Sequence, residues 1–170
     1  MNKISMVDLK GQYLKIKDQI DSSISSVIDS TAFINGPAVK RFQEHLEQYL
    51  NVKHVIPCAN GTDALTVSMM ALNLQPGDEV ITTSFTFIAT AEVIALLRLT
   101  PVVVDVDPDT FNIDPDAIRR AITPKTKAIV PVHLFGQCAN MEAILEIAEK
   151  HGLFVIEDAC QSIGADYIFK

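Results

Sequence analysis

The sequence has 170 residues, 48% of them hydrophobic, and a formal net charge of -7 at pH 7. This length and apolar content fit one domain with a sizeable core, or part of a larger domain. The acidic balance argues against nucleic acid or an anionic membrane surface as the main partner. The opening MNKISMVDLK lacks the apolar region of a signal peptide, and no apolar run approaches the roughly 20 residues of a membrane span. We therefore expect a cytoplasmic protein that binds neither nucleic acid nor a membrane.

The first 50 residues predict a helical segment. Apolar residues recur at helical spacing, with charged or small polar residues between them, at Ile16, Ile20, Ile24, Val27 and Ile28. Such a stripe indicates a helix that lies on something larger. The break at Asn35, Gly36 and Pro37 then starts a second helix, because proline suits the first turn. Its apolar face is formed by Val39, Phe42, Leu46, Tyr49 and Leu50.

Residues 51–170 alternate short apolar runs with helical stretches. The predicted strands are His54 to Pro57, Glu79 to Thr83, Pro101 to Val106, Lys127 to His133 and Leu153 to Ile156. The predicted helices are Thr62 to Leu72, Ile88 to Leu97, Pro115 to Ile122 and Met141 to His151. This alternation predicts an α/β fold with three layers, in which helices cover both faces of a mostly parallel sheet. No internal repeat or linker marks a further domain boundary.

The turn into the first of these helices, residues 58–64, reads CANGTDA. Gly61 lets the backbone come close to a ligand, and Thr62 can cap the helix or donate a hydrogen bond. Amides and the positive dipole end at a helix N-terminus form a ready anion site. The motif is neither GxGxxG nor a Walker loop, so an ordinary Thr or Asp cap explains it about as well.

Two phenylalanines follow the second predicted strand, in the stretch SFTFIAT. A ring at Phe85 or Phe87 can stack on a bound heteroaromatic group just beyond the strand end. Their spacing alone instead favours a place in the core for both.

Neither the acidic run nor the cysteines predict a metal site. The run from Asp105 to Asp116 superficially resembles a calcium loop, but Thr110 stands where that loop needs glycine and Asp116 replaces its bidentate glutamate. We expect acidic turn and helix-start residues there instead. The cysteines are odd in number, far apart and without CxxC spacing, so small core thiols are expected rather than disulfides or a zinc site, at Cys58, Cys138 and Cys160.

Asp158 is the candidate around which binding chemistry is expected. The apolar run Leu153 to Ile156 leads straight into Glu157 and Asp158, as in a buried strand that ends in two carboxylates. Ligands of parallel sheets sit outside the carboxyl ends of the strands, and a buried carboxylate there needs a cation or several donors. The alternative is an aspartate that caps the next helix. His133, at another strand end, can line the same crevice or serve as a hydrogen-bonded structural histidine.

Together these segments resemble a known family. The series NGPAVKRF, ANGTDAL, PGDEVI, SFTFIAT, PVVVDVDPDTFNIDP, TKAIVPVHLFGQ and VIEDACQSIGA is similar to the N-terminal part of the DegT/StrS sugar aminotransferases, which have the aspartate-aminotransferase fold (fold type I). The resemblance covers nearly the whole chain in order. It implies that residues 1–170 are an incomplete, N-terminal portion of the large domain that binds the cofactor, pyridoxal 5'-phosphate. Within it, residues 1–50 form the helical segment and residues 51–170 the alternating part.

The resemblance also implies roles for individual residues. Asp158 matches the aspartate that pairs with the pyridine nitrogen, and a protonated ring nitrogen is the cation that this carboxylate needs. Phe87 matches the aromatic residue that stacks on the pyridine face. Gln161 matches a polar side chain near the phenolic oxygen or the phosphate.

The phosphate-binding turn of the family matches Thr62 and Asp63, which act mainly through backbone amides, with Gly61 allowing the close approach. Nothing is implied for Phe85, His133 or Glu157, and no metal ligand is implied.

For the complete protein, the resemblance implies a homodimer with shared active sites that transfers an amino group from glutamate to a nucleotide-linked keto sugar, in surface-polysaccharide or sugar-antibiotic biosynthesis. The expected course is ping-pong transamination through a lysine Schiff base. In the family that lysine lies downstream of the EDACQ motif, after a glycine-rich loop. We do not assign Lys170 this role, so we expect the 170 residues alone to be inactive.

Two alternatives stay open. Some members of the family carry histidine in place of the lysine and dehydrate the sugar. A noncatalytic ligand-binding or regulatory module is favoured if both lysine and histidine are absent from that position.

Overall fold

The computed structural model describes residues 7–169, so Lys170 lies outside the described residues. The chain divides into two compact units, residues 1–57 and residues 58–170. This division falls a few residues after the predicted end of the helical segment at residue 50.

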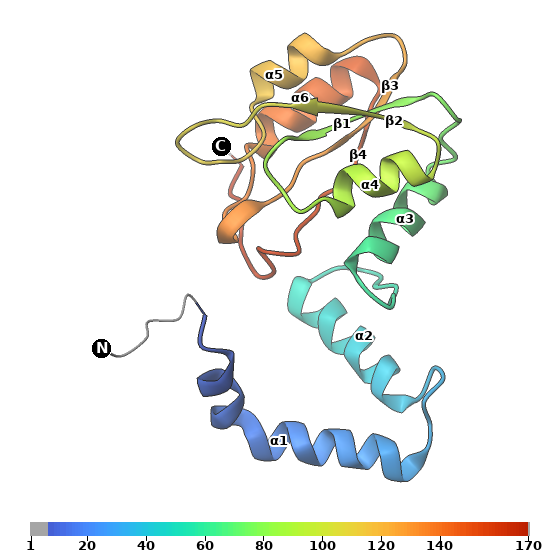
Figure 1. The fold of residues 1–170 in the computed structure, drawn as a ribbon, viewed down its shortest axis with the longest axis vertical. Coiled ribbons are helices and arrows are strands. Elements are labelled where there is room, and N and C mark those ends of the chain that lie inside the picture. Colours follow the sequence, from blue (N-terminus) through green and yellow to red (C-terminus); the bar gives the residue numbers. More distant parts are fainter. Residues whose placement is uncertain (1–6, 170) are drawn as a thin grey trace. The chain divides into compact units, whose positions relative to one another are not determined.

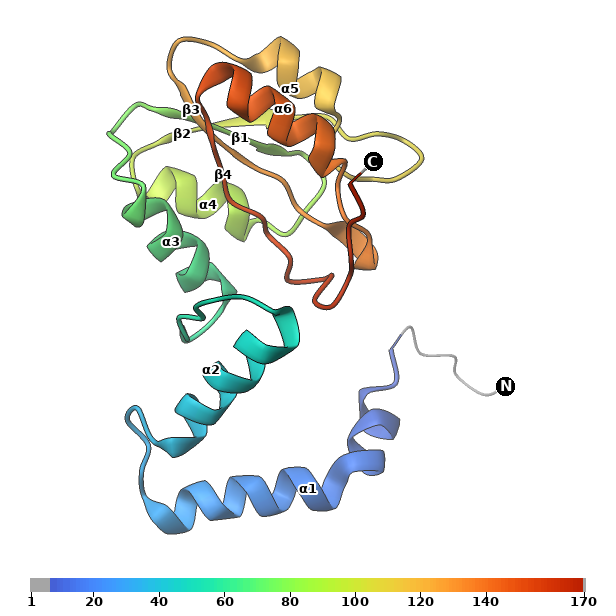
Figure 2. The ribbon, with the colours of Figure 1, turned by 180° about the vertical axis from the view of Figure 1, so that it is seen from behind.

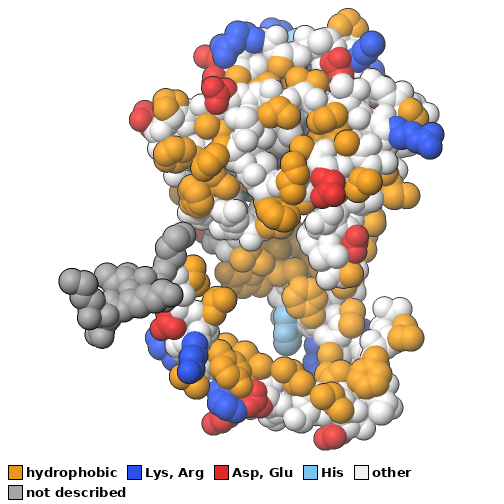
Figure 3. Space-filling view, viewed as in Figure 1, with side chains coloured by type: hydrophobic (Ala, Val, Ile, Leu, Met, Phe, Trp, Pro, Cys, Tyr) orange, Lys and Arg blue, Asp and Glu red, His pale blue; other side chains and the backbone are white. Residues whose placement is uncertain are grey.

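The N-terminal unit contains the two predicted helices, α1 (Leu9–Ser30) and α2 (Pro37–Leu50). The side chain of Asp8 caps α1 by accepting a backbone N–H of its first turn, and Pro37 occupies the first turn of α2. Neither helix contains a buried residue. Figure 3 shows hydrophobic side chains at the surface of both. The apolar stripes that predicted these helices are therefore exposed or only partly buried in this structure.

The C-terminal unit is built on a parallel sheet. Within the described residues, the strands are hydrogen-bonded in the order β2-β1-β3-β4. They are β1 (Glu79–Thr83), β2 (Thr100–Val104), β3 (Thr126–Val130) and β4 (Phe154–Val155). The helices of this unit are α3 (Gly61–Ala71), α4 (Ala89–Leu96), α5 (Pro115–Ala121) and α6 (Met141–His151), with the 3-10 turn η1 (Leu134–Gly136). The predicted α/β alternation is confirmed for all of these helices and strands.

Helices cover both faces of the sheet, which confirms the predicted three layers. Figures 1 and 2 show α3 and α4 on one face and α5 and α6 on the other. Strand residues alternate between two separate cores: Val80 and Val130 pack in the cluster beneath α3 and α4, and Ile81 and Ile129 pack in the cluster beneath α5 and α6. Because the central strands are buried on both sides, consecutive apolar residues such as Val80 and Ile81 are both fully buried.

One predicted strand is wrong. Residues 54–57 are assigned no regular structure, and within the described residues β1 to β4 pair only with one another. The backbone N–H of Val55 donates instead to the Glu47 side chain at the end of α2, at 3.0 Å. A strand forms only where a neighbouring strand supplies hydrogen-bond partners for its backbone. Here the partner of the Val55 N–H is a side chain, not a strand.

No helix within residues 7–169 combines the length and the apolar character needed to cross a membrane.

Candidate cofactor site

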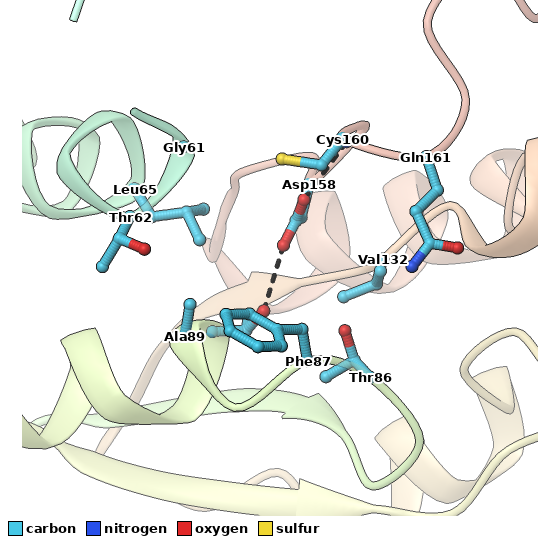
Figure 4. Close-up of a pocket in the computed structure, with 11 residues that line it drawn as sticks. Gly61, Thr62, Leu65, Thr86, Phe87, Ala89, Val132, Asp158, Cys160 and Gln161 are labelled. Atoms are coloured by element: carbon cyan, nitrogen blue, oxygen red, sulfur yellow. Dashed lines mark hydrogen bonds between the residues drawn. The ribbon is translucent and has the colours of Figure 1, made fainter. Parts of the chain in front are cut away.

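The order of the strands places a crevice at the middle of the sheet. The chain runs from β1 to its neighbour β2 on one side, and from β3 to its neighbour β4 on the other. Ligands of open parallel sheets bind at the carboxyl ends of two such strands, where the connections diverge. A cavity of about 210 Å³ lies there, lined by residues that follow β1, β3 and β4 and by the start of α3. Figure 4 shows these residues pointing toward one another.

Asp158 lies at the floor of the cavity and is only 8% exposed. Its backbone extends the parallel pairing beyond β4, because its N–H donates to the Pro131 carbonyl at 2.9 Å. One carboxylate oxygen accepts the Thr90 hydroxyl at 3.0 Å, and the other accepts the backbone N–H of Cys160 at 3.3 Å. Within residues 7–169, no lysine or arginine forms an ion pair with this carboxylate. A buried carboxylate held only by neutral donors favours a ligand that brings a positive charge.

The N-terminus of α3 forms one wall of the cavity. Gly61 and Thr62 line it, in the first turn, where helix geometry leaves the amides without intrahelical acceptors. A Cβ atom built on Gly61 would lie 3.1 Å from the Cys160 Sγ, so a side chain at this position requires the thiol to move by a few tenths of an ångström. Amides and the helix dipole make this wall suited to an anion such as phosphate.

Asp63 takes a different place from its two neighbours in the predicted turn. Its N–H donates to the Asn60 side-chain oxygen at 2.9 Å, and the Asn60 amino group donates to its carboxylate at 3.0 Å. The structure thus caps α3 with Asn60 and leaves Asp63 out of the cavity lining. The role of its amide in phosphate binding stays a prediction.

The aromatic wall comes from the turn after β1. Phe87 lines the cavity and is 72% exposed, whereas Phe85 lies outside it and contacts the rings of Phe111 and Phe135, with centroids 5.9 and 6.3 Å away. The expectation from spacing that both rings belong to the core is wrong, because neither is buried. An exposed ring beside a buried carboxylate can cover the face of a flat ligand.

Gln161 completes the lining from the segment after Asp158. Its side-chain oxygen accepts the backbone N–H of Phe135 at 3.2 Å. Since that oxygen is engaged outside the cavity, the amino group is the part of the amide that remains to donate to a ligand.

The cavity brings together Gly61, Thr62, Phe87, Asp158 and Gln161, which were all selected from the sequence. Sequence reasoning missed Thr90, Val132 and Cys160. Thr90 carried a usable signal, because a threonine in the first turn of the helix after a strand end faces the same crevice as that strand end.

The remaining candidates lie outside this cavity. His133 is buried and hydrogen-bonded through both ring nitrogens, and it does not line the cavity. In the acidic run, Asp107 accepts two backbone amides of its own turn and Asp114 caps α5, as expected for turn and helix-start residues.

The predicted core position of the cysteines is wrong for Cys58 and Cys160, which are exposed. Within the described residues, none of the three cysteines forms a disulfide. Partial burial and the neighbouring Asp158 carboxylate raise the pKa of the Cys160 thiol.

Comparison with known proteins first defines the class. The fold is that of pyridoxal-phosphate-dependent aminotransferases of fold type I. DesV from S. venezuelae, solved in complex with a ketimine intermediate, is 36% identical with a TM-score of 0.92, over 96% of this chain and 44% of that chain. The chain itself belongs to the DegT/DnrJ/EryC1/StrS aminotransferase family, whose model matches residues 14–169. The resemblance inferred from the sequence is confirmed.

Two relatives are more similar to this chain in sequence than DesV is. The UDP-2-acetamido-2-deoxy-3-oxo-D-glucuronate aminotransferase of Pseudomonas aeruginosa is 53% identical over 96% of this chain and 46% of its own length. A protein named pleiotropic regulatory protein, from Geobacillus stearothermophilus, is 52% identical over 96% of this chain and 44% of its own length. The chain therefore spans about half the length of the curated relatives it matches. The family depends on pyridoxal phosphate, and other structural neighbours contain bound pyridoxamine phosphate or hydrated pyridoxal phosphate.

Proposed function

We propose that the whole protein is a pyridoxal-phosphate-dependent aminotransferase, and that the cavity around Asp158 holds the cofactor. The observation that carries this proposal is the buried Asp158 carboxylate, which has only neutral donors within residues 7–169. The protonated pyridine ring of the cofactor is a suitable cation for this carboxylate. Its nitrogen donates one hydrogen bond, and the ring is flat, so Phe87 can cover its face.

The other lining residues fit the remaining groups of the cofactor. The first-turn amides of α3 at Gly61 and Thr62 bind the phosphate. The amino group of Gln161 donates to the phenolic oxygen or to the phosphate, because Phe135 already engages the side-chain oxygen. Thr90 holds the Asp158 carboxylate in place through its hydroxyl. When bound, the cofactor supplies an electron sink for the carbanion that forms at the amino-acid carbon. Asp158 keeps the proton on the ring nitrogen and so maintains that sink.

The substrates are proposed from the relatives. The Pseudomonas aeruginosa protein is named for a UDP-linked 3-oxo sugar, which supports a nucleotide-linked keto sugar as amino acceptor for this chain as well. Glutamate as donor, a homodimer, a cytoplasmic location and a place in polysaccharide biosynthesis complete the proposal. No lysine lines the cavity within residues 7–169, so we place the Schiff-base lysine outside the described residues.

A regulatory role is the second candidate, favoured by the name of the relative from Geobacillus stearothermophilus. It predicts that the protein binds pyridoxal phosphate or a related ligand in the same cavity without turnover of glutamate.

The test is a titration of the whole protein with pyridoxal phosphate, followed by absorbance, and an assay of 2-oxoglutarate release from glutamate with a UDP-linked 3-oxo sugar. Replacement of Asp158 by Ala removes the counter-charge of the ring nitrogen, so we expect turnover to fall about 100-fold or more while the fold persists. Asp116→Ala, an exposed carboxylate outside the cavity, is the matched control. Wild-type turnover in the Asp158→Ala variant contradicts the assignment, and binding without turnover in the wild-type protein favours the regulatory role.

A further inference from the structure

His133 has a buried, hydrogen-bonded side chain to which the proposed function assigns no role. It follows the carboxyl end of β3, is 3% exposed and does not line the cavity. Both of its ring nitrogens make hydrogen bonds: Nδ1 lies 3.1 Å from the backbone nitrogen of Ala139, and Nε2 lies 2.7 Å from a carboxylate oxygen of Glu157.

These two partners fix the protonation of the ring. A backbone N–H can only donate, so Nδ1 must accept and carries no proton. The proton of the neutral imidazole then sits on Nε2 and is donated to the Glu157 carboxylate. Glu157 therefore orients the ring, and the ring holds the amide of Ala139.

The ring closes a loop whose backbone groups are satisfied from within the fold. Residues 134–138 leave the strand end at His133 and return to it where Ala139 donates to the ring. Asn112 fills the loop from the inside: its oxygen accepts the N–H of Leu134 at 3.0 Å, and its amino group donates to the carbonyls of Gln137 and Cys138, each at 3.2 Å. The loop is thus held at its base by His133 and in its middle by Asn112.

A backbone hydrogen bond links this loop to a residue that lines the cavity. At its tip, Phe135 adopts a left-handed backbone conformation with φ of 54°, which aromatic residues rarely adopt. The N–H of Phe135 donates to the Gln161 side-chain oxygen at 3.2 Å. His133 is also tied to the floor of the cavity, because its N–H donates to the Asp158 carbonyl at 2.9 Å.

We propose that His133 is a positioning residue for the cofactor: its ring, in the form protonated at Nε2, fixes the loop so that Phe135 turns the Gln161 amide and aims its amino group into the cavity. This inference rests on the proposed function, since it names what Gln161 needs in order to donate to the cofactor. In this proposal Glu157 acts on the cofactor site indirectly, because it orients the His133 ring, which in turn holds the loop.

Two substitutions distinguish the roles of the two ring nitrogens of His133. In His133→Asn, the amide oxygen can take the place of Nδ1 and accept the Ala139 amide, while nothing reaches Glu157. In His133→Gln, the amide nitrogen can take the place of Nε2 and reach Glu157, while the acceptor for Ala139 is lost. Because the loop closes at Ala139, we expect His133→Gln to weaken the affinity for pyridoxal phosphate about three- to tenfold and His133→Asn to restore most of it.

The decisive experiment is a double-mutant cycle on the dissociation constant for pyridoxal phosphate, measured with the whole protein. Gln161→Ala alone weakens binding. If His133 acts through Gln161, adding His133→Gln to Gln161→Ala weakens binding no further, although each change alone does. Equal effects of His133→Gln in both backgrounds overturn the proposal and leave His133 a merely structural residue. No binding by the wild-type protein overturns the proposed function as well, so the two failures are distinguishable.

Two further measurements keep the test independent of folding defects. Glu157 is half-exposed, so Glu157→Gln is expected to fold, and we expect it to follow the same cycle with a smaller loss of affinity. Nitrogen-15 chemical shifts of the histidine rings report the tautomer directly. We expect His133 to carry its single proton on Nε2 at neutral pH, and a proton on Nδ1 would overturn the assignment.

Discussion

Close approach, rather than backbone conformation, explains glycine at position 61. Gly61 begins α3, and the nearest neighbour of an added Cβ is the Cys160 Sγ, at 3.1 Å. A methyl group at this distance requires the thiol to move by a few tenths of an ångström. A branched side chain extends further into the cavity, over the amides that we assign to the phosphate.

Replacing Gly61 by Val is therefore expected to weaken the affinity for pyridoxal phosphate by about tenfold or more, while the melting temperature changes little. The physical reason is the loss of room in front of the first-turn amides. Titration by absorbance checks the affinity, and thermal unfolding checks the fold. Gly61→Ala combined with Cys160→Ala is the control, because it removes the thiol that the new methyl group meets. An unchanged titration for Gly61→Val would show that the turn is only a helix cap.

Glu157 gives a prediction about pH. The hydrogen bond from His133 lowers the pKa of the Glu157 carboxyl, and partial burial opposes this effect. A carboxyl whose pKa is lower in the folded state stabilises the fold fully above its unfolded pKa of about 4.3 and loses that contribution as the pH falls through its folded pKa. We expect the difference in unfolding free energy between the wild type and Glu157→Gln to be constant above about pH 5 and to shrink below pH ~4. Denaturant unfolding from pH 3 to pH 7 measures it, and a difference that grows on acidification contradicts the prediction.

The sequence was informative about residues whose chemistry follows directly from their place in a pattern. Asp158 follows an apolar run that leads into a strand end, so its place there could be predicted. The prediction that this strand is itself buried is wrong, because Phe154 is 48% exposed and Val155 is only partly buried. The bond between Gln161 and Phe135 joins residues 26 apart through a loop whose shape depends on Asn112 and His133. No local pattern encodes such a contact, so this part of the site could not be derived from the sequence alone.

At the scale of the elements, periodicity predicted every helix and the strands that pair within the unit. It failed at residues 54–57, where the sequence is apolar but no strand pairs with it. Apolar runs report burial and β propensity, whereas a strand also needs a partner, which is a property of the whole sheet. The cap of α3 was missed for a related reason: Asn60 and Asp63 are both good caps, and only the backbone geometry shows that Asn60 serves.

The assignment of Asn60 can be tested by its effect on stability. Asn60 accepts the N–H of Asp63, so Asn60→Ala leaves that first-turn amide without its acceptor. We expect the unfolding free energy to fall by about 0.5 to 2 kcal/mol, while Asn60→Asp stays near the wild type. A loss of stability on replacing Asp63 but not Asn60 would reverse the assignment.

At the scale of the whole molecule, the two units differ in how they use apolar residues. The C-terminal unit buries them in two clusters on opposite faces of its sheet. In α1 and α2 many of them stay exposed, including Ile24, Ile28 and Phe42. Exposed apolar side chains at helical spacing are typical of a face that another surface covers, which supports the proposed homodimer.

We therefore expect the 170-residue chain to self-associate through these helices when it is prepared on its own. Replacing Ile24 and Ile28 together by Lys puts two charges on the apolar face of α1, so the sedimentation coefficient should shift toward that of the monomer. Ser22→Lys with Ser26→Lys adds the same two charges to exposed polar positions of the same helix and should leave association unchanged. Sedimentation velocity over a range of protein concentrations measures the outcome. A wild-type chain that stays monomeric at high concentration, with α1 and α2 intact by circular dichroism, would show that these stripes are not an interface.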